Sequence, residues 1–172
     1  MLGDIFSRLK RQNSQSLMQA QMHFDKGVRL AAEGQLSKAI KAYLAAIEIH
    51  PKFVTAYKNL GAAYDEMGQF VDALKVYAKA IVLVPQDAEL RIDLGLVYFN
   101  IGSYAEAIKA FKQALDIDSH NAGAHYCLGL VYLDLGDIQM AFEEHEQLTS
   151  QNEKDLAFQL LDKIQLQIRQ AS

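Results

Sequence analysis

The sequence predicts an all-α protein built as an array of four helix pairs. Three ladders of small residues, each with a step of 34 residues, carry this prediction. The ladders are Gly27, Gly61, Gly95 and Gly129; Gly34, Gly68, Gly102 and Gly136; and Ala39, Ala73, Ala107 and Ala141. A fixed period of this size indicates a repeat array in which each unit is one supersecondary motif. Hydrophobic residues make up 51% of the chain, which is enough to build a packed core.

Each repeat divides into two helical patterns. In the second repeat, Tyr57, Leu60 and Tyr64 recur at the spacing of one helix face. Gly68 is expected to end that helix, because glycine tolerates the left-handed conformation of a C-cap. Pro85 is expected to end the next helix, since the residue before proline is disfavoured in helical geometry. The expected boundaries are a leader at 1–16, a repeat region at 17–155 with repeats at 20–53, 54–87, 88–121 and 122–155, and a C-terminal helix at 156–172.

The small residues predict where the paired helices cross. Gly61 and Ala73 are expected to face each other and to let the two backbones approach closely. A large side chain at Gly61 would then open the helix pair and destabilise it by roughly 1–3 kcal/mol.

The leader, residues 1–16, allows two interpretations. Apolar residues lie on one side of a possible short helix that also carries cations, and the sequence NSQS, residues 13–16, is expected to form a polar break or an N-cap. Such a segment could be an amphipathic anchor for a membrane surface or a partner. It could equally be a frayed leader or a turn of helix on the first repeat, because a short isolated helix is marginally stable. The apolar residues are Leu2, Ile5, Phe6 and Leu9, and the cations are Arg8, Lys10 and Arg11.

The C-terminal segment is expected to form a capping helix, since a repeat buries its apolar face only against a neighbour. The apolar face of this helix consists of Ala157, Leu160, Leu161, Ile164 and Ile168. The alternative is that this helix lies in the binding groove as an internal ligand. Phe158 and Leu166 fall off the main face and leave room for a dimer contact.

The repeat pattern resembles the tetratricopeptide repeat family over about residues 20–155. The second repeat supplies the residues that this family favours: Tyr57, Leu60, Gly61, Tyr64, Ala73, Tyr77, Ala80 and Pro85. The fourth repeat departs most, with His145, Leu148 and Glu153 at family positions. The resemblance implies a right-handed α-solenoid that acts as a non-enzymatic protein-interaction scaffold.

In this family, one face of each repeat's first helix lines a concave groove that binds peptides or helices. The resemblance therefore implies a set of partner-binding residues, of which those in the third and fourth repeats are markedly apolar. The predicted set is Ile92, Leu96, Phe99, Tyr126, Leu130, Leu133, Asp93, Asp65, Lys58 and Phe24. An acidic rim flanks the apolar residues, which predicts a protein or peptide segment with apolar anchors and nearby Lys or Arg. The rim consists of Asp65, Glu66, Glu89, Asp93 and Asp134. The alternative is that a tight superhelix or the C-terminal helix buries the apolar residues internally.

Family members that grip acidic chaperone tails share a clamp of Lys, Arg and Asn side chains. At the corresponding positions this chain has Phe24, Val28, Asn59, Glu89 and Asp93, of which only Asn59 matches. An acidic tail would meet acids or apolar groups at these positions, which argues against that class of ligand.

Composition restricts the other possibilities. The net charge of −4 disfavours nucleic acid as a partner, because nucleic-acid binding requires a basic face. A single cysteine, Cys127, allows no intrachain disulfide and fits a reducing compartment. No membrane span or signal peptide is recognisable, which predicts a cytoplasmic location. The remaining alternatives are a membrane-surface assembly factor tethered by its leader and a regulatory, non-catalytic enzyme subunit, and oligomers are possible.

Enzymatic motifs are not found in the sequence, and no cofactor or metal is predicted. His125 and His145 are expected to pack near each other in the fourth repeat. They are interpreted as replacements for core aromatic residues, because a metal site would need further ligands.

Overall fold

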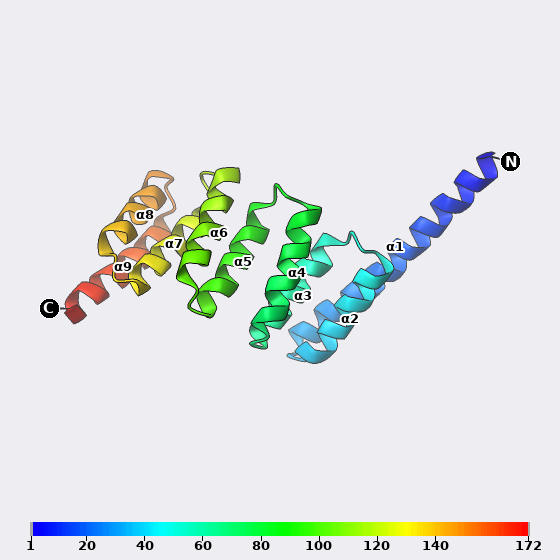
Figure 1. Ribbon diagram of the computed structural model, residues 1–172, viewed down its shortest axis with the longest axis horizontal. Coiled ribbons are helices and arrows are strands. Elements are labelled where there is room, and N and C mark those ends of the chain that lie inside the picture. The colour runs from blue at the N-terminus through cyan, green and yellow to red at the C-terminus, as the bar shows by residue number, and fades with distance from the viewer. Residues whose placement is uncertain (1, 172) are drawn as a thin grey trace. The chain divides into compact units, whose positions relative to one another are not determined.

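The computed structural model describes residues 2–171, and the side chains of residues 13–170 (Figure 1). The all-α prediction is confirmed, since no strand occurs in the described range. The chain divides into two compact units, residues 1–84 and 85–172, and each is described by itself. The first contains α1 (Leu2–Ala32), α2 (Leu36–Ile49), α3 (Val54–Glu66) and α4 (Phe70–Leu83). The second contains α5 (Ala88–Asn100), α6 (Tyr104–Ile117), α7 (Ala122–Asp134), α8 (Ile138–Ser150) and α9 (Lys154–Ala171).

Glycine and proline end the helices where the sequence predicts. Gly68 follows α3 with a φ of +70°, and the equivalent Gly34 follows α1 with a φ of +73°. The helix α4 ends at Leu83, two residues before Pro85. These ends are local properties of the chain, because only glycine adopts the left-handed region without a steric penalty.

The first helix differs from the prediction. It runs without interruption through residues 13–16, where a polar break was expected, and crosses the expected leader boundary. The Ser16 hydroxyl donates to the Asn13 carbonyl oxygen at 3.0 Å, so this polar side chain is accommodated on the helix itself. The leader's predicted apolar and cationic residues lie outside the described side chains.

An aromatic ring fills the space beside the ladder glycines of the first three repeats. A Cβ atom on Gly61 would lie 2.6 Å from Tyr77 Cζ, and its three nearest atoms would all belong to the Tyr77 ring. Tyr77, and not the expected neighbour Ala73, is therefore the residue that requires a glycine at position 61. Tyr43 and Phe111 fill the same space beside Gly27 and Gly95. The glycine makes room for a ring as well as for a close helix crossing.

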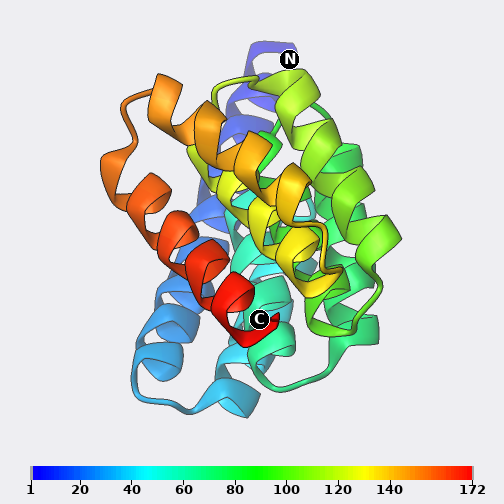
Figure 2. The ribbon, with the colours of Figure 1, turned by 90° about the vertical axis from the view of Figure 1, so that its left-hand side faces the viewer.

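In the fourth repeat a different side chain fills the space beside the ladder glycine. A Cβ atom on Gly129 would lie 2.5 Å from Leu160 Cδ2, so a leucine of α9 takes the place that an aromatic ring has elsewhere. Figure 2 shows α9 in red beside α7 and α8, and all three pack together. Leu160 and Ile164 are completely buried. The helix α9 therefore caps the array, as predicted, and it also supplies the residue that His145 does not.

Candidate functional site

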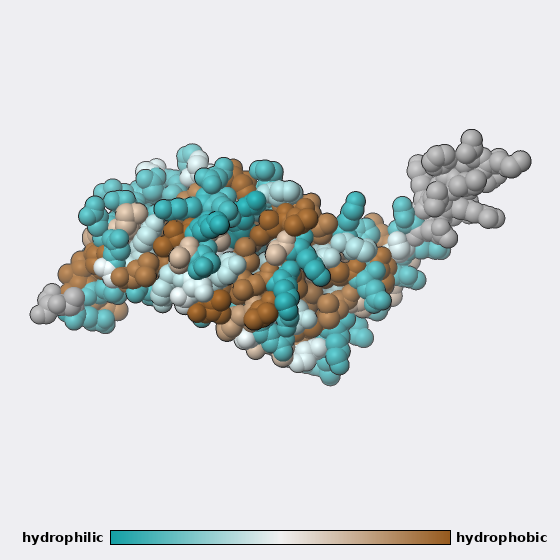
Figure 3. All heavy atoms as spheres, in the orientation of Figure 1, coloured by the Kyte–Doolittle hydropathy of each residue, from teal (hydrophilic) through white to brown (hydrophobic). Residues whose placement is uncertain are grey.

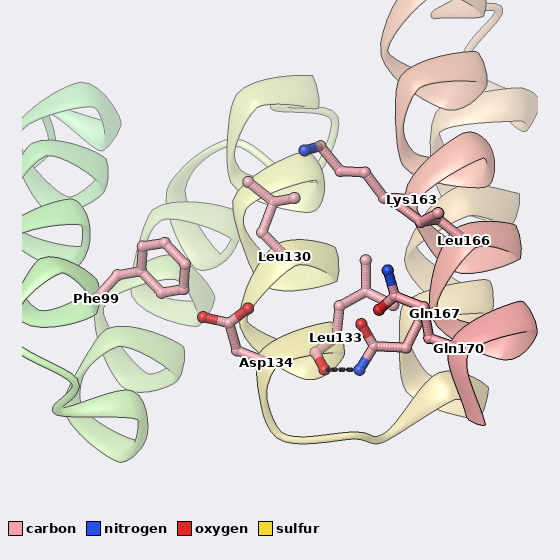
Figure 4. A pocket seen from close by; sticks show the side chains of 8 residues that line it. All are labelled: Phe99, Leu130, Leu133, Asp134, Lys163, Leu166, Gln167 and Gln170. Atoms are coloured by element: carbon pink, nitrogen blue, oxygen red, sulfur yellow. Dashed lines mark hydrogen bonds between the residues drawn. The ribbon is translucent and has the colours of Figure 1, made fainter.

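A pocket of about 320 Å³ opens in the second unit between α5, α7 and α9 (Figure 4). We call it the α5–α7–α9 pocket. Its lining residues are Phe99 from α5, Leu130, Leu133 and Asp134 from α7, and Lys163, Leu166, Gln167 and Gln170 from α9. Figure 4 shows Phe99 reaching from α5 toward α7, with the Asp134 carboxylate between them. The lining thus combines apolar side chains with a few polar and charged groups, as is typical of ligand sites.

Three residues of the predicted groove line this pocket: Phe99, Leu130 and Leu133. The prediction for Ile92 needs correction, because it is 6% exposed, belongs to the core and does not line the pocket. Leu133 is also a core residue, at 5% exposed, but it borders the pocket. Leu96 and Tyr126 are partly buried and pack against the same core, and neither lines the pocket. The alternative that the apolar groove residues are covered internally therefore applies to Ile92, Leu96 and Tyr126.

The third wall of the pocket was not predicted from the sequence. Lys163, Leu166, Gln167 and Gln170 come from α9, for which the sequence predicts a capping helix or, as the alternative, an internal ligand in the groove. The Gln167 side-chain amide donates to the Leu133 carbonyl oxygen at 3.0 Å and holds α9 against the end of α7. In the sequence, a sign that α9 has a second contact surface is that Leu166 falls off the apolar face of this helix. The structure gives that residue a place at the pocket, where it is still about half exposed.

Fewer acidic residues line the pocket than the sequence predicts. Only Asp134 among the predicted acids lines the pocket, and the Tyr104 hydroxyl donates to its carboxylate at 3.2 Å. The negative charge of Asp134 raises the pKa of Tyr104, with smaller contributions from burial and from the hydrogen bond itself. Glu89 instead accepts a hydrogen bond from the Asn121 side chain, and Asp93 is half-buried outside the lining. A ligand in the pocket would therefore meet one carboxylate opposite one ammonium group, Lys163.

Three predicted residues belong to the first unit. Phe24 packs its ring against Tyr43 and Phe53, with ring centroids 5.8 and 5.1 Å apart, and so has a packing role. Lys58 and Asp65 are half-buried on α3. No residue of the first unit lines the α5–α7–α9 pocket.

His125 forms a buried pair with Glu144 rather than with His145. The distance from His125 Nδ1 to the Glu144 carboxylate is 2.7 Å, and His125 Nε2 lies 3.3 Å from the Ser119 carbonyl oxygen. A carbonyl only accepts, so Nε2 carries a proton, and one further proton is shared between Nδ1 and the carboxylate. Burial raises the pKa of Glu144, although the hydrogen bond and charge of His125 act in the opposite direction.

The Cys127 thiol is not activated as a nucleophile. Burial, reinforced by Glu89, raises the pKa of the Cys127 thiol to about 11, which leaves little thiolate at neutral pH. Among the described residues, no group of three or more His, Cys, Asp or Glu side chains could hold a metal ion. None of the helices in the described range is sufficiently long and apolar to span a bilayer.

Surface hydrophobicity does not indicate a second, broader site on the face drawn in Figure 1. Figure 3 shows apolar and polar surface interleaved there. Scattered exposed apolar side chains are ordinary on a folded protein. The α5–α7–α9 pocket is therefore the best candidate for apolar ligand groups.

Comparison with known families decides the classification. A family model described as "TPR repeat" matches residues 27–68 and 98–136, and one described as "Tetratricopeptide repeat" matches residues 54–87. The chain belongs to the tetratricopeptide repeat family. This confirms the resemblance and the solenoid class. A comparison with curated protein sequences gave no match.

Solved structures agree with this classification. A crystal structure of MamA protein is 26% identical with a TM-score of 0.70, and the match covers 87% of this chain and 91% of that one. A tetratricopeptide repeat protein from Parabacteroides merdae ATCC 43184 has a TM-score of 0.76 at 20% identity, covering 89% and 61% of the two chains. The Arabidopsis OM64 TPR domain has a TM-score of 0.65 at 23% identity, covering 69% and 98%. The last two likenesses concern the fold alone.

The tetratricopeptide fold is typically a non-catalytic interaction module. A family assignment names a class of function, and the ligand has to be argued from the site itself. The chain is accordingly a protein-interaction scaffold, and its partners are proteins in general.

Proposed function

We propose that this tetratricopeptide protein acts without catalysis and binds a partner segment in the α5–α7–α9 pocket. The observation that carries the proposal is the convergence of Phe99, Leu130 and Leu166 from three helices on one cavity of about 320 Å³. A cavity of this size accepts one or two large apolar side chains of a peptide or a helix.

Charge defines the rest of the ligand. Asp134 is exposed at the rim and accepts one hydrogen bond, from the Tyr104 hydroxyl, which leaves carboxylate acceptor capacity for a Lys or Arg of the ligand. Gln170 on the opposite wall offers amide groups that suit the backbone of a bound segment. The ligand is therefore an apolar anchor followed closely by a basic residue.

Selection from a random peptide library displayed on phage, followed by fluorescence anisotropy of the enriched peptides, tests this proposal. We expect the enriched peptides to share an aromatic or aliphatic residue near a Lys or Arg. Phe99→Glu and Leu130→Glu should abolish their binding with an unchanged melting temperature. Asp134→Asn should weaken binding about tenfold, in line with the loss of one charge-assisted hydrogen bond.

A matched control is available on the same unit. Phe158 is 71% exposed on α9 and does not line the pocket, so Phe158→Glu should leave peptide binding unchanged. Equal loss of binding in Phe158→Glu and Phe99→Glu would refute the assignment of the site. Unfolding of both pocket variants would show that Phe99 and Leu130 are core residues, and the proposal would fail.

A further inference from the structure

A second concave surface lies in the first unit, between α1 and α2. Its volume is about 340 Å³, and we call it the α1–α2 groove. His23, Lys26 and Leu30 of α1 face Lys38, Lys41 and Ala42 of α2 across it. Leu30 and Ala42 are largely covered and give the groove an apolar floor, while the three lysines are exposed around it.

The charge of this groove is one-sided. Three lysines line it, and no carboxylate is among its lining residues. Lys38 Nζ lies 2.7 Å from the neutral Gln35 side-chain oxygen, and the described residues record no ion pair for Lys26 or Lys41. The whole chain has a net charge of −4, so this concentration of cations is a local exception to an acidic protein. Such a surface favours an anionic partner.

The repeat symmetry suggests the shape of that partner. Leu60 of α3 and Leu128 of α7, the equivalents of Lys26, are each 1% exposed. Leu60 and Leu128 are covered because the second helix of the preceding repeat packs on the helix that carries them. The helix α2 packs on α3, and α6 packs on α7. Lys26 is instead exposed on α1. The α1–α2 groove is thus the position at which the fold elsewhere receives a helix.

We propose that the α1–α2 groove docks an acidic amphipathic helix of a partner protein. Apolar side chains of that helix pack on Leu30 and Ala42, and its Glu or Asp residues pair with Lys26, Lys38 and Lys41. A bilayer surface is less well matched, because lipid headgroups would reach the lysines but not the apolar floor of a concave groove. This surface is separate from the α5–α7–α9 pocket and does not depend on the function proposed for it.

The test uses the full chain and a synthetic stapled helix of Leu, Ala and Glu, with leucines at i, i+3 and i+4 spacing and glutamates on both flanks. Fluorescence anisotropy should give micromolar binding that weakens as salt is raised. The double variant Lys26→Glu/Lys41→Glu should weaken it at least tenfold, since both side chains are exposed and the fold is kept. The control Lys75→Glu/Lys79→Glu changes two exposed lysines of α4 and should have no effect. Phe99→Glu should also bind the helix normally.

Three results would overturn the proposal. The first is equal binding of a peptide in which every glutamate is replaced by lysine. The second is equal binding of a proline-substituted acidic peptide that cannot form a helix. The third is the absence of peptide binding, with Lys26→Glu/Lys41→Glu abolishing sedimentation with phosphatidylserine vesicles, which would assign the lysines to a membrane surface.

Discussion

The packing of Leu160 against Gly129 leads to a quantitative prediction about the capping helix. Leu160 of α9 is completely buried, and its Cδ2 atom occupies the space beside Gly129 that an aromatic ring fills in the other repeats. The substitution Leu160→Ala removes this contact and leaves a void, because a glycine cannot extend into it. The end of the array then loses part of its cover.

Removing a fully buried leucine costs its transfer free energy plus the free energy of the cavity that remains. For a completely buried site we expect a loss of about 3 kcal/mol in the free energy of unfolding. In a chain of this length that corresponds to a melting temperature lower by roughly 6–12 °C. Leu166→Ala on the same helix is the control, since Leu166 is 54% exposed and should cost well under 1 kcal/mol.

Urea unfolding followed by circular dichroism measures both variants, and a double-mutant cycle adds specificity. Gly129→Ala alone should destabilise the protein, because its Cβ would lie 2.5 Å from Leu160 Cδ2. In the Leu160→Ala background the same methyl group enters the vacated space, so its cost should largely disappear. Additive free energies in the cycle, or a loss below about 1 kcal/mol for Leu160→Ala, would refute the packing described for the fourth repeat.

Two further predictions concern the interiors of single repeats. Gly61→Leu should lower the free energy of unfolding by about 3 kcal/mol through overpacking against Tyr77, whereas Ala62→Leu, at the exposed neighbouring position, should be nearly neutral; equal melting temperatures would contradict the assigned register. The raised pKa of Glu144 means that the folded state holds its proton more tightly than the unfolded state, so this contribution to stability is complete at acid pH and is lost as pH rises through the folded-state pKa. Glu144→Gln cannot ionise and can donate to His125 Nδ1, so its stability relative to wild type should increase as pH rises above the ordinary glutamate pKa of 4.5 in urea titrations; a difference independent of pH would contradict this account.

Local rules account for the parts of the fold that the sequence predicts correctly. The ladder Gly34, Gly68, Gly102 and Gly136 marks helix ends because each of these residues has a positive φ. From α2 to α8 each helix begins and ends within one predicted repeat, because apolar spacing and helix breakers act over a few residues. The polar break at residues 13–16 failed as a prediction because Ser and Asn can also be accommodated inside a long helix.

The candidate site was predicted only in part, because it depends on contacts between distant segments. Phe99, Leu130 and Leu133 were identified from their place in the repeat. Nothing in their spacing shows that α9 forms the opposite wall. Ile92 has the same repeat position as Phe24, Lys58 and Tyr126, which are all only partly buried, yet packing in the second unit buries Ile92.

The sequence by itself determined that this protein is a tetratricopeptide array, because a 34-residue period of small residues admits few other architectures. It also determined the class of function, since the repeat pattern is that of a protein-interaction scaffold. Tertiary structure alone decided that Leu160 replaces an aromatic ring over Gly129, that Glu144 is the partner of His125, and that α9 completes a pocket. Periodicity specifies which face a residue occupies, but which neighbour covers that face depends on how whole helices pack.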